Sequence, residues 1–198
     1  IHTDGWTTHL ITGTFDWDVG SYSGNSFAEM SNYDGTNHES ETWLITPAID
    51  LATASAPVFS FMNTCNYSGP DIEVRISTSY NGTGVPDPAN WTALSPTLST
   101  GGWDWVSSGD ISLTDYKGGD VYIAFIYTGS NSDGKTWEID DFAVFEAMQL
   151  AFNTNLGEGT TVTLPLQGTV DVTVDWGDGT TPETITTAGD LDHTYAAE

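Results

Sequence analysis

The segment Val121-Tyr122-Ile123-Ala124-Phe125-Ile126-Tyr127 is apolar or aromatic at every position. A strand covered on both faces has such a continuous pattern, whereas a strand with one wet face alternates apolar and polar residues. Residues 71–77 show the alternating pattern, and the turn signal Asn81-Gly82 follows them. These segments predict a β-sheet with a central strand at residues 121–127 and a strand with one face in water at residues 71–77.

Further apolar segments occur at residues 43–49 and 58–62, and clusters of Gly, Pro, Asn and Asp separate them. Pro47 favours a bulge or a sheet edge within the first of these segments. No segment has the convincing period of an amphipathic helix. Several short strands with turns between them predict an all-β fold, a jelly-roll β-sandwich.

The chain changes character after Glu146. The residues that follow are rich in Thr, and residues 170–176 alternate like a strand before Gly177-Asp178-Gly179 turns the chain. We therefore predict two domains: residues 1–147 form a jelly-roll domain of the binding or adhesin type, and residues 148–198 form a short β unit. Because about 50 residues are few for an independent β-domain, we expect the second unit to be incomplete.

The charge balance excludes several classes of partner. The chain has 3 Lys and Arg residues against 28 Asp and Glu residues, a formal net charge of −25. Nucleic acids and anionic lipids are bound through clustered Lys and Arg, so neither is an expected partner. No apolar run approaches the roughly 18 residues of a membrane span, and we expect no direct membrane insertion. Cys65 is the single cysteine, which excludes an intrachain disulfide and predicts a buried thiol.

Five motifs follow one another along the first 147 residues. They are Trp43-Leu44-Ile45-Thr46-Pro47-Ala48-Ile49-Asp50-Leu51, Ile76-Ser77-Thr78-Ser79-Tyr80-Asn81-Gly82, Asn90-Trp91-Thr92, Val121-Tyr122-Ile123-Ala124-Phe125 and Trp137-Glu138-Ile139-Asp140-Asp141. In this order they resemble cleaved-adhesin and choice-of-anchor-J domains, which are secreted bacterial jelly-roll modules similar to MAM domains and to calcium-containing carbohydrate-binding modules. The resemblance implies a monomeric module within a larger secreted or cell-surface bacterial protein, and it does not fix a ligand.

The end of the chain carries a second resemblance. Val174-Asp175-Trp176-Gly177-Asp178-Gly179 and His193-Thr194-Tyr195 are similar to the opening of a PKD-like, immunoglobulin-type repeat. In that family further strands follow the His-Thr-Tyr motif, whereas this chain stops at Glu198. The resemblance implies a spacer or stalk whose closing strands lie outside this sequence.

Asp140-Asp141 is the most informative polar feature. If Trp137 and Ile139 point into the core, alternation puts Asp141 on the same inward face unless a bulge intervenes. A buried carboxylate requires a partner, and with so few basic residues the expected partner is Ca²⁺, which takes 6–8 oxygen ligands. We predict Asp141 as the leading ligand and Asp140 as the second. The alternative is a solvated pair of acids that ends a strand.

The resemblance adds further candidates for the calcium ligands. In similar jelly rolls the matching acid near the last strand ligates a structural calcium, and the segment before Trp43 lies near that strand. The candidates in this early part of the chain are Asp4, Asn37, Glu39 and Glu41. Asp16-Trp17-Asp18 instead indicates an acidic turn, because it lacks the later ligands of an EF-hand loop.

The aromatic residues indicate a carbohydrate ligand, because Trp and Tyr faces stack on the C–H faces of pyranose rings. Trp103 and Trp105 alternate onto one face of an expected strand, and the other candidates, Trp17, Tyr22 and Tyr33, lie in Gly-rich and Ser-rich loops. Trp103 and Trp105 fit either a core or a surface position, and we expect Trp17 and Trp105 to be exposed. Trp43, Trp91 and Trp137 stand within the strand motifs, where core positions are expected.

No motif for catalysis is present. The sequence has no Gly-x-Ser-x-Gly elbow and no phosphate-binding loop, and His38-Glu39 lacks the second His of a zinc protease. We therefore predict a non-catalytic, calcium-stabilised recognition module that binds an extracellular glycan or a cell-surface protein. The alternative is a structural spacer or a protein-binding adhesion module without glycan affinity. A glycoside-active enzyme would require two carboxylates in one cleft.

Overall fold

The apolar segment around Ile123 forms β11 (Asp120–Gly129), which lies between β4 and β7 in the first sheet. Ile123, Ala124 and Phe125 are fully buried. Ile123 and Phe125 belong to the main core, whereas Ala124 belongs to a smaller cluster on the other face. Burial of both faces explains why no polar residue interrupts this segment, and the predicted central strand is confirmed.

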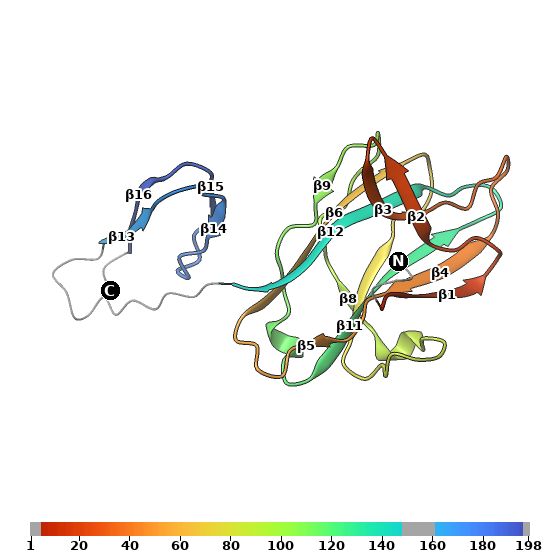
Figure 1. Cartoon of the computed structure of the whole chain (residues 1–198), viewed down its shortest axis with the longest axis horizontal. Coiled ribbons are helices and arrows are strands. Elements are labelled where there is room, and N and C mark those ends of the chain that lie inside the picture. The colour runs from red at the N-terminus through yellow and green to blue at the C-terminus, as the bar shows by residue number, and fades with distance from the viewer. Residues whose placement is uncertain (1–4, 148–160, 196–198) are drawn as a thin grey trace. The chain divides into compact units, whose positions relative to one another are not determined.

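The computed structural model describes residues 5–147 and 161–195 (Figure 1). The chain splits into two compact units, Ile1–Gln149 and Leu150–Glu198. The described residues contain strands and no α-helix. They also contain two short 3₁₀ turns, at Pro88–Asn90 and Thr114–Tyr116. The predicted all-β fold is confirmed. No helix in the described residues is long and apolar enough to cross a membrane.

The first sheet is antiparallel, with the strand order β1-β4-β11-β7-β8 and with β5 paired to β11. Its other strands are β1 (Thr7–Thr12), β4 (Ser40–Ile45), β5 (Ile49–Asp50), β7 (Glu73–Ser77) and β8 (Thr92–Leu94). The apolar run of residues 43–49 is divided between β4 and β5, with Pro47 between the two strands. This break agrees with the missing N–H of proline, which prevents a continuous ladder.

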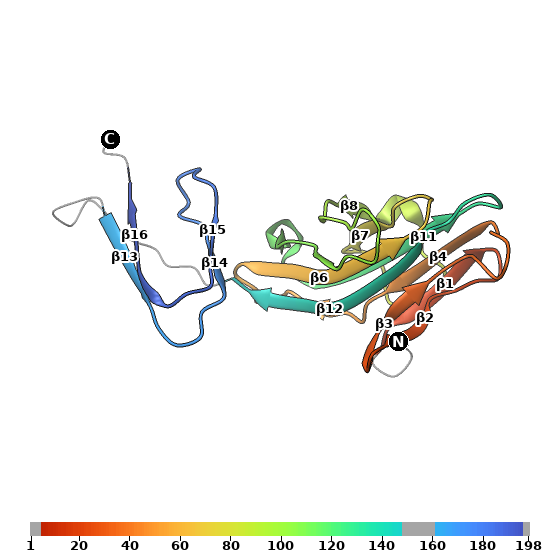
Figure 2. The same cartoon turned by 90° about the horizontal axis from the view of Figure 1, so that it is seen from above.

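The second sheet is also antiparallel, with the order β10-β6-β12-β3-β2 and with β9 paired to β6. Its strands are β2 (Asp18–Tyr22), β3 (Asn25–Met30), β6 (Pro57–Asn66), β9 (Val106–Ser107), β10 (Ile111–Ser112) and β12 (Thr136–Glu146). The two sheets form two facing layers, as the view from above shows (Figure 2). The first unit is therefore a β-sandwich, as predicted.

The main core lies between the two sheets, and Phe125 of the first sheet meets Phe59 and Phe61 of the second. Trp137 is fully buried in this core. A second cluster covers the outward face of the first sheet, where Trp43 packs edge to face on Trp91 with ring centroids 5.5 Å apart. The three tryptophans expected in the core are all buried.

The second unit contains two separate antiparallel pairs. β13 (Thr161–Leu166) pairs with β16 (Gly189–Thr194), and β14 (Val172–Val174) pairs with β15 (Glu183–Ile185). Trp176 is buried and stacks on His193, with ring centroids 4.5 Å apart. This stack connects the turn after β14 to β16 and so holds the two pairs together.

Candidate functional site

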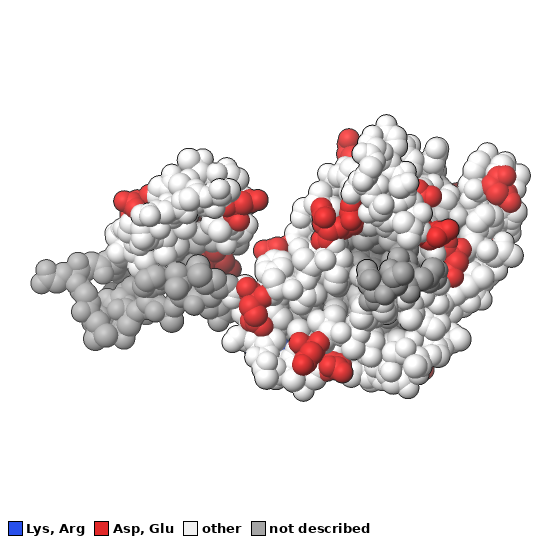
Figure 3. Space-filling model, in the orientation of Figure 1, with Lys and Arg blue, Asp and Glu red and all other residues white. Residues whose placement is uncertain are grey.

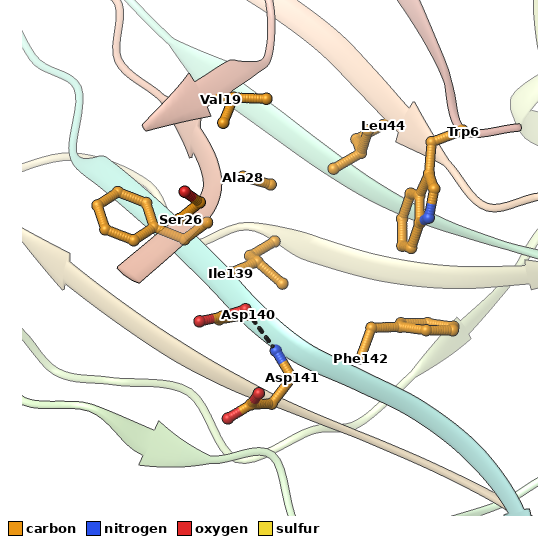
Figure 4. A pocket seen from close by; sticks show the side chains of 10 residues that line it. Trp6, Val19, Ser26, Ala28, Leu44, Ile139, Asp140, Asp141 and Phe142 are labelled. Carbon is orange, nitrogen blue, oxygen red and sulfur yellow. Dashed lines mark hydrogen bonds between the residues drawn. The ribbon is translucent and has the colours of Figure 1, made fainter. Parts of the chain in front are cut away.

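A pocket of about 240 Å³ opens between the two sheets of the sandwich. Leu44 of β4 lines it from the first sheet, together with Trp6, the residue that precedes β1. Residues of β2, β3 and β12 line it from the second sheet. The apolar side chains of Ile139, Phe142, Trp6 and Leu44 line its interior (Figure 4). The carboxylates of Asp140 and Asp141 lie together at one side, so the pocket combines an apolar interior with a polar side.

A β-bulge in β12 creates this arrangement. The register with β6 shifts between Asp140 and Ala143, and Asp141 has a left-handed backbone with φ +49°. The extra residue turns Asp141 outward and returns Phe142 to the inward face. The expected inward position of Asp141 is therefore wrong, because the bulge breaks the alternation that the expectation assumed. Asp is one of the few residues that tolerate a left-handed backbone.

The carboxylate of Asp140 is fixed by two donors. Asn25 Nδ2 donates to Asp140 Oδ2 at 2.7 Å, and the Asp141 backbone N–H donates to Asp140 Oδ1 at 2.8 Å. The Asp141 carboxylate is exposed beside it. The two adjacent acids thus present one hydrogen-bonded and one exposed carboxylate at the pocket, without a Lys or Arg among the residues that line it.

Aromatic rings form the opposite side of the pocket. Trp6 and Phe142 meet edge to face with centroids 5.0 Å apart, and Trp6 also stacks on Phe125 at 6.3 Å. Trp6 is half-buried, so part of its indole remains open to the pocket. Sequence reasoning missed both Trp6 and Phe142, because neither belongs to a motif and only the bulge brings Phe142 inward.

The structure does not gather the predicted calcium ligands at one place. Glu41 accepts a hydrogen bond from Trp43 Nε1 at 3.1 Å, on the outward face of β4, whereas Leu44 points into the pocket. Glu39 lies in the loop before β4, where its backbone N–H donates to Asn131 Oδ1, and Asn37 forms a bridge with Tyr33. Asp4 lies outside the described residues.

Within residues 5–147 and 161–195, no three or more His, Cys, Asp or Glu side chains come close enough together to hold one metal ion. Of the predicted set, only Asp140 and Asp141 are neighbours in the described structure. Beside the two carboxylates, the Ser26 hydroxyl lines the same pocket and offers a further oxygen, whereas the Asn25 amide turns its Nδ2 group toward Asp140. Oxygen donors of this kind suit a hard cation such as Ca²⁺.

The predicted aromatic candidates are divided between core and surface. Trp17 is 2% exposed and belongs to the main core, so its expected exposure is wrong. Trp105 and Trp103 are each 39% exposed, and Tyr22 and Tyr33 are exposed. None of these five residues lines the pocket.

Two exposed aromatic residues are held by other rings. Trp105 packs on Phe27 of β3 with centroids 5.9 Å apart, and Trp103 packs edge to face on Tyr67 at 6.0 Å. Both Trp103 and Tyr67 have a left-handed backbone, with φ +64° and φ +71°. Bulky residues rarely adopt this conformation, and both rings are exposed.

Comparison with known proteins identifies the fold. No family model matches the chain, and no curated protein sequence matches it. Among solved structures, a cleaved adhesin domain of Lys-gingipain from Porphyromonas gingivalis is 19% identical, with a TM-score of 0.51 over 73% of this chain and 92% of that chain. This likeness shows a β-sandwich of the cleaved-adhesin kind, and at such low identity it concerns the fold alone.

Two carbohydrate-binding modules are also among the matches. TmCBM61, solved in complex with β-1,4-galactotriose, is 16% identical over 72% of this chain and 88% of that chain, with a TM-score of 0.47. A family 11 module from Clostridium thermocellum, solved with a β-1,3-1,4-mixed-linked tetrasaccharide, is 16% identical over 74% of this chain and 91% of that chain, with a TM-score of 0.46.

Proposed function

We propose that the first unit is a non-catalytic recognition module of a secreted or cell-surface bacterial protein, and that its pocket binds a neutral sugar residue of a glycan. The observation that carries this proposal is the juxtaposition of the Trp6–Phe142 aromatic pair with the carboxylates of Asp140 and Asp141. Aromatic rings pack on the C–H face of a pyranose, and fixed carboxylate oxygens accept hydrogen bonds from its hydroxyl groups. A neutral ligand also suits a chain of net charge −25, which repels anions.

Affinity electrophoresis tests this proposal with gels that contain galactan, mixed-linkage β-glucan or xyloglucan. We expect the wild-type protein to be retarded by at least one polysaccharide and Trp6→Ala to lose most of the retardation. Tyr33→Ala is the matched control, because Tyr33 is an exposed aromatic residue outside the pocket. Circular dichroism of each variant checks that the sandwich remains folded.

The outcomes separate the competing sites. Equal loss of retardation in Tyr33→Ala and Trp6→Ala would contradict a specific role of the pocket. Loss in Trp105→Ala with no change in Trp6→Ala would place the ligand on the exposed aromatic residues instead. Absence of retardation by every polysaccharide would favour the protein-binding or spacer role.

We further propose that Ca²⁺ binds at Asp140 and Asp141, with the Ser26 hydroxyl as an additional ligand and water completing the coordination. The ion would neutralise the two adjacent carboxylates and fix the Asp141 side chain. Chelation with EDTA should then lower the melting temperature of the wild-type protein. Asp141→Asn should reduce this effect, and an unchanged effect in Asp141→Asn would contradict the site.

For the second unit we propose the role of a PKD-like spacer. The turn Trp176-Gly177-Asp178-Gly179 and His193, which carry the resemblance, pack on one another in the structure. Removal of residues 148–198 should therefore leave glycan retardation unchanged. A loss of retardation in this truncated protein, with the first unit still folded, would assign a binding role to the second unit.

A further inference from the structure

A row of polar residues crosses the outward face of the second sheet. Neighbouring strands place Asp18 opposite Glu29, Glu29 opposite Glu138, and Glu138 opposite Thr64. Each of the four is adjacent along the chain to a residue of the main core, namely Trp17, Met30, Trp137 and Cys65, so their four side chains share the other face. Directly opposed residues on one face have Cβ atoms about 4.5–5.5 Å apart. Three carboxylates and one hydroxyl thus form a continuous line across four strands.

No basic side chain neutralises this row. The three basic residues of the chain are engaged elsewhere: Arg75 pairs with Glu73 at 2.5 Å, Lys135 pairs with Asp71, and Lys117 donates to the Ser55 carbonyl oxygen at 2.8 Å. Like charges directly opposed across strands destabilise a sheet. The folded protein therefore holds these acids at an energetic disadvantage when no cation is bound.

Thr64 supplies an independent sign of a missing partner. Although it lies on the outward face, it is 1% exposed, and its hydroxyl oxygen has no hydrogen-bond partner among the described residues. A buried hydroxyl without a partner costs roughly 1–3 kcal/mol. The ring of Trp105 packs on Phe27, two residues along β3 from Glu29, so apolar surface borders the row on the same face.

We propose that this row is a divalent-cation site, distinct from the pocket, in which Glu29, Glu138 and Thr64 ligate Ca²⁺ and Asp18 adds negative charge. Two carboxylates and a hydroxyl offer the hard oxygen ligands that Ca²⁺ prefers, and its flexible coordination tolerates water in the remaining positions. Mg²⁺ fits less well, because it demands near-octahedral geometry and retains most of its water. A site with so few protein ligands should bind in the range of about 10⁻⁴–10⁻³ M that is usual for extracellular modules.

The test is a titration of the ¹⁵N-labelled full chain with CaCl₂ up to 10 mM, followed by amide chemical shifts. We expect saturable shifts at Glu29, Glu138 and Thr64, and at least a tenfold weaker apparent Kd for them in Glu138→Gln. Glu73→Gln is the matched control, because it removes one carboxylate from the other sheet and should leave these shifts unchanged.

Two further variants separate a ligand role from a structural one. Thr64→Val should weaken binding several-fold, and Thr64→Ser, which keeps the hydroxyl, should restore it. In calcium-free buffer Glu138→Gln should melt at a higher temperature than the wild-type protein, yet gain less from added calcium. If Glu138 had only a structural role, its replacement would not raise the melting temperature without calcium and also reduce the gain from added calcium.

The same titration distinguishes this site from the pocket. Shifts confined to residues 140–142 would overturn the proposal and leave the calcium site of the pocket standing. Shifts at Glu138 that persist in Asp140→Asn support the row as a separate site. Absence of shifts at Glu29, Glu138 and Thr64 up to 10 mM calcium, or equal shifts in Glu138→Gln, would also overturn it.

Discussion

Ile139 and Phe142 lie on the same inward face of β12 although three positions separate them. In a regular strand, residues an odd number of positions apart point to opposite faces, so one extra residue must be accommodated between them. Asp141 is that residue. The bulge thus has two consequences at once: it closes the apolar interior of the pocket with Phe142 and presents two adjacent carboxylates beside it.

The first prediction distinguishes the bulged register from a regular one. Phe142→Ala should lower the free energy of unfolding by about 2–3 kcal/mol, because the ring packs on Trp6 and Phe59 in the core. Phe145→Ala should lower it by less than about 1 kcal/mol, because Phe145 is 42% exposed. Urea denaturation measures both values. A regular strand would place Phe145 inward and reverse the order of the two variants.

The second prediction concerns the backbone of Asp141. Its left-handed conformation is unfavourable for residues with a Cβ atom and favourable for glycine. In calcium-free buffer Asp141→Gly should therefore be more stable than Asp141→Ala by about 1 kcal/mol. Thermal and urea unfolding of the two variants provide the comparison, and equal stability would indicate that the bulge relaxes when the side chain is shortened.

The sequence predicted the sandwich well because its strands carry strong local signals. Residues 121–127 are apolar without interruption, which predicts a strand buried on both faces. Residues 71–77 alternate between apolar and polar, which predicts a strand buried on one face. Local patterns do not reveal where a strand bulges. The alternation counted from Ile139 therefore placed Asp141 inward. The true orientation of Asp141 depends on its left-handed backbone conformation, which the spacing of residues in the sequence does not indicate.

Trp17 shows a second limit of local reasoning. Its position between two acids indicated an exposed turn, but Asp16 accepts hydrogen bonds from the hydroxyls of Thr8 and Thr42 and from the Trp17 backbone N–H. These bonds fasten the segment to the first sheet and direct the indole into the core. The pocket was equally hidden, because the segments that line it are distant in sequence and meet only through the folding of both sheets.

The third prediction is a dependence on acid pH in the second unit. Hydrogen bonds from the Thr180 hydroxyl and backbone N–H, and from His193, lower the pKa of Asp178 from 3.8 to about 2. Because the pKa is lower in the folded state, the stabilisation is complete above the unfolded value near 4 and is lost as the pH falls toward 2. The Thr180 amide resonance should titrate with a midpoint near 2, and Asp178→Asn should abolish the transition. A midpoint near 4 would show that these hydrogen bonds do not hold the carboxylate in solution.

The last prediction follows from the net charge of −25, because 3 basic residues stand against 28 acidic ones. On the face shown in Figure 3, the acidic side chains form several separate patches, so their mutual repulsion acts over many pairs and not within a single cluster. Salt shortens the range of such repulsion to a Debye length of about 8 Å at 0.15 M. Since repulsion between like charges opposes the compact state, the melting temperature should rise as NaCl is increased from 0.01 to 0.5 M in the presence of EDTA.

The salt series needs a control for specific ions, because the proposed calcium sites also respond to cations. Choline chloride at the same ionic strength has a bulky cation that carboxylate pairs do not ligate, and it should raise the melting temperature by a similar amount. For a chain of this size, each kcal/mol of stabilisation corresponds to roughly 2–4 °C. A melting temperature that rises with NaCl but not with choline chloride would assign the effect to bound sodium. A melting temperature that falls in both salts would mean that attractive pairs such as Arg75–Glu73 outweigh the repulsion.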